Sequence, residues 1–536
     1  MRIAVVGSGP SGVAAASELV RQGHAVDVLD VGHAPDAASR ALAAEVRATV
    51  LRGERPNRAL YRALRLGPEG GASSAWAGLA ALFGRLDAER SQKRILGSTF
   101  VWDGADAGIP VDNEMVTRSL AKGGLSNAWG AACYSWREGD FAGWPIGAAE
   151  LAPHYARAAA LLGLEQPKDA LAGAYPLLGA STGDAPRNPG SPVEHLLGRW
   201  RAHEAELAVA GLAPGRARLA VRRDTCTRCG LCFYGCAFGA IWHAGQPLDA
   251  LALRYRPDCF VQGFREEAGG VRLFGSAPDG ALDERYDAAL LAAGVLSSLR
   301  IAADSLDRHG HAVPLLDNEL YLLPLLTLGA GPAFGFRSAF TLGEAVLAVE
   351  AGVVSTRPLH IQLYSFHEFF LAELADVLRA LPKLLQDVAY ALLNRIAIGF
   401  VYLPGADSTR ATASVVAAAG GPGRVRIDAA PQAESRAILA RLLAHLRRLR
   451  GPLGFWPLPG LVKSTPFGFH GHLAGTLPMR ASPGPLECDV SGRLHGTARV
   501  FVVDPAAFPT LPAQNLTFTA MANALRIAAG LSESVR

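Results

Sequence analysis

The apolar positions in residues 1–30 predict a strand, a helix and a second strand. Residues 3–6 form a continuous apolar run, which is typical of a buried parallel strand. Residues 11–21 repeat apolar side chains at helical spacing, and residues 25–29 form a second apolar run. This order of elements indicates an α/β fold.

Three glycines occupy the predicted turn between the first strand and the helix. Gly7, Gly9 and Gly12 have the spacing G-x-G-x-x-G, and Asp30 follows about 20 positions later. Gly9 would let the backbone approach a pyrophosphate, and the helix N-terminus would offer free N–H groups to it. A carboxylate at Asp30 can accept hydrogen bonds from ribose hydroxyls. The context favours a dinucleotide site over the alternative, a glycine-rich turn without a ligand.

A second glycine-rich turn, residues 121–133, is again suited to close backbone approach to a cofactor. Its candidate cofactor-binding residues are Gly124, Ser126 and Asn127. Elsewhere the pattern predicts helix and loop over 35–100, a surface helix over 150–165, a long loop over 168–195, strands near 259–275 and a strand over 288–291.

Residues 315–465 mix strand and helix patterns, which predicts a separate substrate domain. The charge-free span 320–336 contains two prolines and three glycines, so it reads as buried strand and turn, not as a membrane helix. Residues 368–396 carry a broad apolar helical stripe that Pro382 should kink or divide. The preferred interpretation is a core helix, and the alternative is a helix that lies on a membrane surface.

Four of the seven cysteines form one run, Cys226, Cys229, Cys232 and Cys236. Their spacing, C-x2-C-x2-C-x3-C, is that of bacterial ferredoxins, which hold a [4Fe–4S] cluster on thiolates. Two glycines within the run free the backbone to wrap a compact cluster. The alternatives are structural zinc, whose usual ligand pairs have a longer spacer, and inert buried thiols. We therefore predict a [4Fe–4S] cluster.

The fourth ligand of this cluster stays open. Ala237 stands where ferredoxins usually have proline, and the fourth cysteine of such a run can serve another cluster. Cys236 is preferred because it is local, Cys259 is the next candidate, and Cys133 and Cys488 are further ones.

Composition narrows the function classes. The chain has 536 residues, 50% of them hydrophobic and 19% charged, which predicts two or three folded domains. The net charge is +4 without a basic block, so we expect no nucleic-acid partner. The cysteine usage indicates a reducing compartment, and the N-terminus lacks the pattern of a signal peptide. We expect a cytoplasmic protein, with peripheral contact to the inner membrane as an alternative.

Two C-terminal segments carry a family resemblance. Residues 467–479 read FGFHGHLAGTLPM, and residues 502–515 have the pattern V-x-D-x-x-x-x-P-x-x-P-x-x-N. These segments, together with WPIGAAELAPHY at 144–155 and ALLAAGVLSSLRI at 289–301, resemble the glucose–methanol–choline (GMC) flavoprotein oxidoreductases. The chain departs from the family pattern at residues 477–479, at Leu516 and in the cysteine run. The last departure puts the electron acceptor in question.

The resemblance implies FAD, not NAD, in the N-terminal site. It also implies that His472 of H-x-x-G-T is the catalytic base and that Asn515 is its partner. Oxidising a carbinol requires removal of the hydroxyl proton, for which an imidazole with a pKa near neutrality is suited. His470 is a second candidate for the base. Asp504 is expected near the flavin ribityl chain, and its alternative role is to cap the final helix.

The implied architecture is α/β, a Rossmann-like FAD-binding domain of discontinuous segments plus an α+β substrate domain. The expected parts are 1–314 (FAD, with lid or loop segments 35–100 and 166–215), 222–245 (iron–sulfur insertion), 315–464 (substrate) and 465–536 (FAD, with the active-site histidine).

The predicted function is that of an FAD-dependent alcohol dehydrogenase. It would oxidise a hydroxyl group of a sugar, sterol or other alcohol and pass electrons through the cluster to a ferredoxin, quinone or similar one-electron acceptor, not to oxygen. The alternatives are a reductase or isomerase fed with electrons through the cluster, and a non-catalytic redox-sensing protein.

Overall fold

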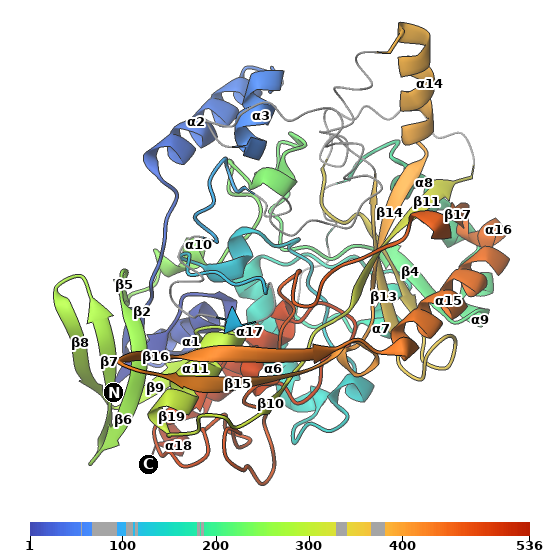
Figure 1. Cartoon of the computed structure of the whole chain (residues 1–536). Coiled ribbons are helices and arrows are strands. Elements are labelled where there is room, and N and C mark those ends of the chain that lie inside the picture. Colours follow the sequence, from blue (N-terminus) through green and yellow to red (C-terminus); the bar gives the residue numbers. More distant parts are fainter. Residues whose placement is uncertain are drawn as a thin grey trace.

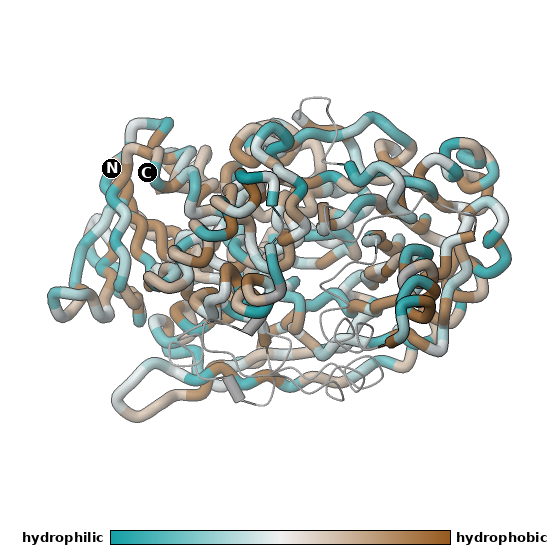
Figure 2. Tube along the Cα trace, turned by 90° about the horizontal axis from the view of Figure 1, so that it is seen from above, coloured by the Kyte–Doolittle hydropathy of each residue, from teal (hydrophilic) through white to brown (hydrophobic). Residues whose placement is uncertain are grey.

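The computed structural model describes residues 1–54, 56–66, 94–102, 111–112, 116–179, 183, 187–328, 340–365 and 381–535. Two main sheets lie at opposite ends of the molecule, with both chain termini beside the first (Figure 1). Hydrophobic residues concentrate along the inner strands and hydrophilic residues along peripheral turns (Figure 2).

The first sheet is parallel and has the strand order β19–β9–β1–β2–β5. Its strands are β1 (Arg2–Val6), β2 (Ala25–Leu29), β5 (Arg254–Arg256), β9 (Ala288–Leu291) and β19 (Val500–Val502). Helices α1 (Pro10–Arg21), α17 (Thr517–Ala529) and α6 (Ala148–Leu162) pack together beside it. The predicted elements at 3–6, 11–21, 25–29 and 288–291 are confirmed. So is the α/β fold with a discontinuous Rossmann-like domain, because its strands come from both ends of the chain.

The second large sheet is antiparallel and lies opposite the parallel sheet (Figure 1). It has the order β17–β11–β14–β13–β12–β4, and β18 pairs with β11. Its strands are β4 (Leu212–Arg216), β11 (Leu320–Thr327), β12 (Ala345–Val349), β13 (Leu359–Ser365), β14 (Ile396–Tyr402), β17 (Phe455–Pro457) and β18 (Lys463–Ser464). Helices α8 (Pro192–Ala202) and α15 (Ala433–Arg448) bury apolar side chains such as Trp200 and Leu442 against one face.

Two smaller sheets complete the scaffold. One is an antiparallel meander of β6 (Phe260–Glu267), β7 (Gly270–Ala277) and β8 (Gly280–Tyr286). The other has the order β10–β15–β16–β3, and its long ribbon packs on α11 (Figure 1). Its elements are β3 (Val111–Asp112), β10 (Val313–Leu315), α11 (Val295–Ser305), β15 (Arg410–Ala418) and β16 (Gly421–Ala430).

The remaining elements are short or peripheral helices. They are α2 (Ala37–Leu51), α3 (Arg58–Leu66), α7 (Leu171–Ala174), α9 (Glu204–Val209), α10 (Gly245–Leu248), α14 (Lys383–Leu393), α16 (Arg450–Leu453) and α18 (Leu531–Ser534), with 3-10 turns η1 (Gly124–Asn127), η2 (Glu138–Phe141), η3 (Cys232–Tyr234), η4 (Gly405–Asp407), η5 (Pro459–Leu461) and η6 (Pro505–Ala507).

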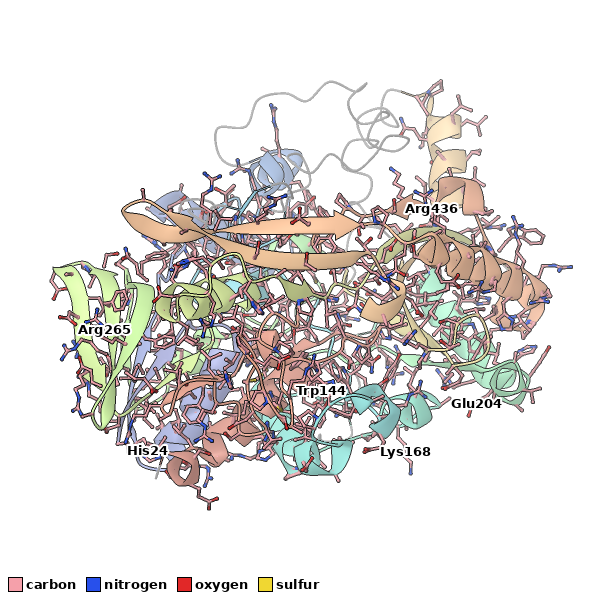
Figure 3. All side chains as sticks on the ribbon, turned by 60° about the horizontal axis from the view of Figure 1, so that its bottom comes forward. His24, Trp144, Lys168, Glu204, Arg265 and Arg436 are labelled. Carbon is pink, nitrogen blue, oxygen red and sulfur yellow. The ribbon has the colours of Figure 1, made fainter. Side chains whose placement is uncertain are left out.

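The helix predicted at 150–165 is less of a surface helix than its sequence indicated. In α6, Leu151, Tyr155 and Ala158 are buried, and the helix packs on α17. Just before it lies Trp144 (labelled in Figure 3). Its indole donates to Thr510 Oγ1 at 2.8 Å and packs against Phe508. The segment that resembles the family pattern thus anchors the C-terminal segment to the rest of the domain.

The apolar stripe predicted at 368–396 lies partly outside the described residues. Within them, α14 begins at Lys383 directly after Pro382, which agrees with a helix divided at this proline. Leu384 is 75% exposed, and Val388 and Leu392 are exposed by 51% and 58%. These side chains are therefore not part of the core, contrary to the preferred sequence interpretation. Of the helices in the described ranges, none is long and apolar enough to cross a membrane.

Candidate active site

The glycine fingerprint divides into two structural glycines and one that faces open space. Gly7 has φ +103°, and a Cβ there would lie 2.4 Å from the carbonyl oxygen of Ala292. A Cβ on Gly12 would lie 2.1 Å from the Gly7 carbonyl oxygen, whereas a Cβ on Gly9 would meet nothing within 4 Å. Gly7 and Gly12 are thus required for packing between strand and helix. Gly9 caps α1, whose first N–H groups have no side-chain cap, and it leaves room for a ligand.

The second predicted glycine turn lies against the first. A Cβ on Gly124 would have Gly9 Cα as its neighbour, at 3.5 Å. The N–H of Gly123 donates to Ser8 Oγ at 2.8 Å, which joins the two turns. The structure therefore brings together two turns that are more than a hundred positions apart in the sequence.

Ser126 and Asn127 shape this second turn through their side chains. Ser126 Oγ donates to the Gly123 carbonyl at 2.5 Å and accepts from the N–H of Ala244 at 2.9 Å. Asn127 Nδ2 donates to the carbonyls of Lys122 and Gly124 at 2.9 and 2.7 Å. Their contacts are with the backbone of the turn and of the segment that follows the cysteine run.

Asp30 lies at the carboxyl end of β2, beside the glycine fingerprint. Its carboxylate accepts hydrogen bonds from Ser8 Oγ and, at 3.1 Å, from the Tyr255 hydroxyl. Burial raises the pKa of Asp30 to about 6, although these hydrogen bonds oppose the shift. The carboxylate thus lies where the sequence places a ribose acceptor.

Asp504 caps a different element from the one predicted. Its Oδ1 accepts from the N–H of Ala506 at 2.9 Å, within η6, whereas the last long helix begins at Thr517. Its Oδ2 accepts from the N–H of Gly294 and from Ser298 Oγ, at 2.9 and 2.6 Å. Burial raises the pKa of Asp504 to about 6. Asp504 therefore fixes the C-terminal segment to the turn that follows β9.

The structure brings His472 and Asn515 together. The distance from Asn515 Nδ2 to His472 Nε2 is 3.3 Å, and the Tyr402 ring stacks on the imidazole at 5.4 Å between centroids. Burial, together with His470 and His360 nearby, lowers the pKa of His472 well below its usual range. The imidazole is thus held neutral, as a base must be, but its pKa is not near neutrality as the sequence analysis expected.

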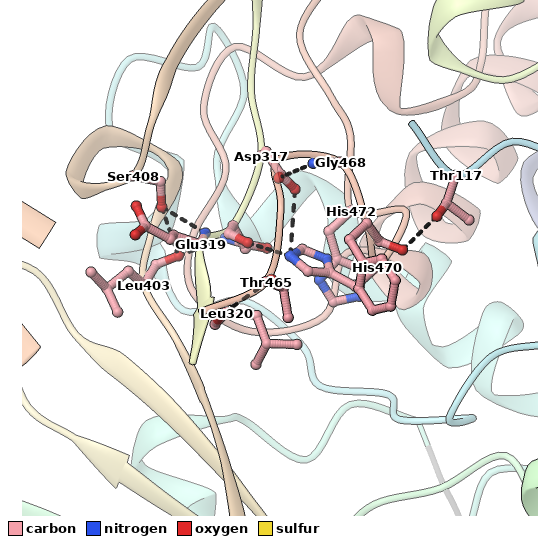
Figure 4. A network of polar contacts seen from close by, with 12 residues as sticks. Thr117, Asp317, Glu319, Leu320, Leu403, Ser408, Thr465, Gly468, His470 and His472 are labelled. Atoms are coloured by element: carbon pink, nitrogen blue, oxygen red, sulfur yellow. Dashed lines mark hydrogen bonds and ion pairs between the residues drawn. The ribbon is translucent and has the colours of Figure 1, made fainter. Parts of the chain in front are cut away.

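His470 is held by the protein backbone. Its Nε2 donates to the carbonyl oxygen of Asn318 and lies 3.6 Å from Asp317 Oδ1, as Figure 4 shows. Residues 467–470 form a turn and not a strand, and the rings of His470 and His472 meet edge to face at 4.7 Å. Because one nitrogen of His470 is already engaged, the geometry favours His472 as the base.

Three polar side chains of β13, which the sequence motifs did not indicate, form a wall of this site. His360, Gln362 and Tyr364 alternate along the strand, are all buried and connect by hydrogen bonds to one another. Gln362 Nε2 also donates to Asn515 Oδ1. The sequence did contain a sign of this wall: in the predominantly apolar strand LHIQLYS, polar groups occupy every second position.

The four-cysteine run forms a lobe with α2 and α3. Leu231 and Tyr234 pack in one cluster with Leu42, Val46, Leu60 and Leu64, and Cys229 lies against it. Each thiol of the run has another thiol of the run as an electrostatic neighbour. In the described ranges, however, no three His, Cys, Asp or Glu side chains converge at metal-binding distance.

The other candidate ligands lie apart from the run. The N–H of Cys259 donates to the carbonyl of Asp30, and its thiol has Arg256 and Glu284 as its nearby charges. The thiols of Cys133 and Cys488 donate to the carbonyls of Ala131 and Leu477. These contacts favour Cys236 as the fourth member of the set.

Comparisons with known proteins agree with this geometry. Residues 461–524, which contain His472 and Asn515, match the family model of the GMC oxidoreductases. The GMC resemblance is thereby confirmed. Residues 5–61 match an NAD(P)-binding Rossmann-like domain. A search of curated proteins gave no match.

One solved structure shares its fold with the whole chain. The crystal structure of pyridoxine 4-oxidase from Mesorbium loti aligns with a TM-score of 0.59 and 18% sequence identity, and covers 99% of both chains. At this identity the likeness establishes the fold. The GMC assignment implies FAD, and the open space at Gly9 beside the uncapped start of α1 suits its pyrophosphate.

A pair of glycine substitutions tests this cofactor site. Gly9→Val should leave the thermal unfolding temperature nearly unchanged and weaken FAD binding, because its side chain enters space that the protein does not fill. Gly12→Val should lower the unfolding temperature, since its side chain would collide with the Gly7 carbonyl. Differential scanning fluorimetry and FAD titration of the apoprotein measure both. Full FAD affinity in Gly9→Val would contradict this placement of the cofactor.

Proposed function

We propose that this protein is an FAD-dependent dehydrogenase that oxidises a hydroxyl group on a small-molecule alcohol. The observation that carries the proposal is the His472–Asn515 pair, enclosed by Tyr402 and lying within the GMC segment. A neutral imidazole with an amide beside it can accept a hydroxyl proton while the amide orients the oxygen.

The roles of the protein groups follow from their chemistry. A substrate hydroxyl between His472 Nε2 and Asn515 Nδ2 would donate to the first and accept from the second. His472 then holds the proton as the carbinol carbon loses hydride, and FAD supplies the hydride acceptor when bound. Gly9, Gly124, Asp30 and Asp504 are the residues proposed to hold FAD.

The wall of the site consists of side chains without net charge. They are phenols, an imidazole and an amide from β13 and β14, and several of them hydrogen-bond to one another. Such a wall offers no charge to bind a carboxylate or a phosphate, so we propose an uncharged alcohol, with sugars, sterols and other alcohols as the alternatives.

We propose further that Cys226, Cys229, Cys232 and Cys236 hold a [4Fe–4S] cluster. The ferredoxin spacing of the four cysteines supports it, and Cys226 and Cys232 each have Cys229 and Cys236 as electrostatic neighbours, although the described side chains do not converge as a metal site. The N–H of Ala240 donates to Cys236 Sγ at 3.2 Å, a contact that would stabilise a thiolate ligand. A cluster here would supply one-electron transfer to a ferredoxin, quinone or similar acceptor, in place of oxygen.

The lobe formed by the cysteine run, α2 and α3 is connected to the second glycine turn by hydrogen bonds. This connection supports the proposed transfer of electrons from FAD to the cluster. The Trp129 indole donates to the carbonyl of Trp242 at 2.8 Å, and the N–H of Ala244 donates to Ser126 Oγ. Both contacts join the segment after Cys236 to the second glycine turn. A cluster in the lobe would therefore lie near the FAD domain.

His472→Ala should retain FAD and slow substrate-dependent flavin reduction by about two to four orders of magnitude, the usual effect of losing a general base. Asn515→Ala should have a smaller effect, and His495→Ala, an exposed histidine in a turn, serves as the control. Anaerobic stopped-flow absorbance measures the rate. Since the pKa of His472 is lowered, the imidazole stays neutral as the pH falls, and the acidic limb of the wild-type rate should lie below pH 6.5.

If His472→Ala reduces its flavin at the wild-type rate, another residue is the base, and His470 is the first candidate. Flavin bleaching by an alcohol also separates this function from a redox sensor, which would show none, and from a reductase, whose flavin would be reduced through the cluster instead.

Anaerobically purified protein should contain about four iron and four sulfide per chain beside the flavin. Cys229→Ser should lose the cluster, keep alcohol-dependent flavin reduction and lose turnover with a one-electron acceptor. Cys236→Ser should lose the cluster and the matched Cys259→Ser should keep it. Metal analysis, electron paramagnetic resonance and stopped-flow give the readouts, and stoichiometric zinc without sulfide would refute the cluster.

We propose second that the protein contacts an anionic membrane surface. The support is that exposed apolar residues and an excess of arginine occur on the same side of the molecule. The exposed apolar residues of α14 lie on the same side as α2 and α3 (Figure 1). Residues 36–66 and 222–239 contain ten arginines and four acidic residues, a larger excess than the +4 of the whole chain. Apolar insertion beside positive charge is the combination that binds peripheral proteins to anionic lipid.

The double variant Leu384→Asp/Leu392→Asp should lose binding to anionic vesicles, because charge replaces the exposed apolar face. Val209→Asp is the matched control, since Val209 is 92% exposed on α9, away from α14. Flotation with anionic and neutral vesicles at low and high salt measures binding. Wild-type protein that never floats with anionic vesicles would end this proposal and leave the enzymatic one intact.

A further inference from the structure

Gln362 occupies the centre of a chain of side-chain hydrogen bonds that ends at the proposed base. It lies on β13, is 2% exposed and pairs across the sheet with Phe400 of β14. Its amide contacts three partners, Tyr364, His360 and Asn515. In the structure, its Oε1 faces Tyr364 and its Nε2 faces His360 and Asn515.

Tyr364 contacts the oxygen of the Gln362 amide. The Tyr364 hydroxyl donates to Gln362 Oε1 at 3.0 Å, so the oxygen of the amide faces Tyr364. The amide nitrogen then faces the other two partners and can only donate to them. One N–H points at His360 Nε2 at 3.0 Å and the other at Asn515 Oδ1.

His360 is the acceptor that this orientation requires. Burial lowers the pKa of His360 to about 3, so the imidazole is neutral and has one acceptor nitrogen. Because Nε2 accepts from Gln362, the proton is on Nδ1, which lies 2.7 Å from the Tyr175 hydroxyl. Both nitrogens of His360 thereby have hydrogen-bond partners, and His360 holds the Gln362 amide on the side opposite Asn515.

The same orientation determines which atom Asn515 presents to His472. Since Asn515 Oδ1 accepts from Gln362, Asn515 Nδ2 is the atom directed at His472 Nε2. A donor at this place requires a lone pair on Nε2, so the proton of the neutral imidazole is on Nδ1. His472 Nδ1 is buried without a hydrogen-bond partner among the described residues, so no second contact fixes this tautomer.

We propose that Gln362 is a positioning residue that holds the Asn515 amide with its nitrogen toward His472 and so keeps Nε2 of His472 unprotonated. The inference rests on the proposed function and names a residue outside the GMC motif, from the opposite sheet. Without Gln362, the Asn515 amide is free to turn its oxygen to His472. An oxygen at that place favours a proton on Nε2, which occupies the atom that must accept the substrate proton and raises the pKa of the imidazole.

Gln362→Met tests this directly, because it keeps the length of the side chain and removes both donors. We expect the acidic limb of flavin reduction to move to higher pH by about one unit, which is about a tenfold slower rate on that limb, with little change far above it. Gln362→Glu should shift the limb further, since a carboxylate accepts from Asn515 Nδ2 and turns the amide over. Gln22→Met at the C-terminal end of α1, where the Gln22 amide donates to Glu18 and to the Ala529 carbonyl, is the control.

A readout without turnover accompanies the kinetics. In FAD-loaded protein labelled with ¹⁵N-histidine, the ring nitrogen shifts report the tautomer and pKa of His472, assigned through His472→Asn. The wild type should keep the proton on Nδ1 down to acidic pH, and Gln362→Met should titrate at higher pH. An unchanged titration, with a rate lowered equally at all pH values, would reduce Gln362 to a packing role and overturn the inference. A shifted titration in a protein that no alcohol reduces would support the inference and refute the proposed substrate class.

Discussion

The parallel pairing of β19 with β9 is the interaction on which the candidate active site depends. It adds a strand from residue 500 onward to a sheet that begins at residue 2, and its register joins Val500, Phe501 and Val502 to Ala289, Leu290 and Leu291. His472 precedes this strand and Asn515 follows it, so the pairing carries both to the FAD domain. In sheets of this kind, ligands bind beyond the carboxyl ends of the parallel strands, where Asp30 and Asp504 also lie.

Around this pairing, buried polar groups fix the positions of nearby segments through directional hydrogen bonds, which apolar packing does not supply. Asp504 receives two N–H groups and a hydroxyl, and it ties the C-terminal segment to the turn after β9. On the other side of the site, Gln362 and His360 form a fully partnered buried network. Such networks are costly when incomplete, so each partner constrains the next. The His472–Asn515 pair therefore contacts strands of the second large sheet, while Asp504 ties the same C-terminal segment to the first.

The molecule places its two proposed redox functions on different parts of the chain. The alcohol site is formed between the two large sheets, and the cysteine run forms its own lobe with α2 and α3. The second glycine turn connects them, because it contacts Gly9 on one side and the segment after Cys236 on the other. Hydride chemistry and electron export could in this way be separated in space and still share one cofactor.

The sequence by itself determined the local parts of this protein. The first strand, helix and second strand, the two glycine turns and the H-x-x-G-T segment are each encoded within a short stretch, through apolar period or the φ values that only glycine adopts readily. The tertiary structure alone decided which of these parts meet. The burial that lowers the pKa of His472 and the partners of Asp504 come from residues far away in the chain. The role of Gln362 also depends on distant residues. Every second side chain of its apolar strand faces the same way, and only the tertiary packing decides whether that side is a hydrophobic core or a functional site.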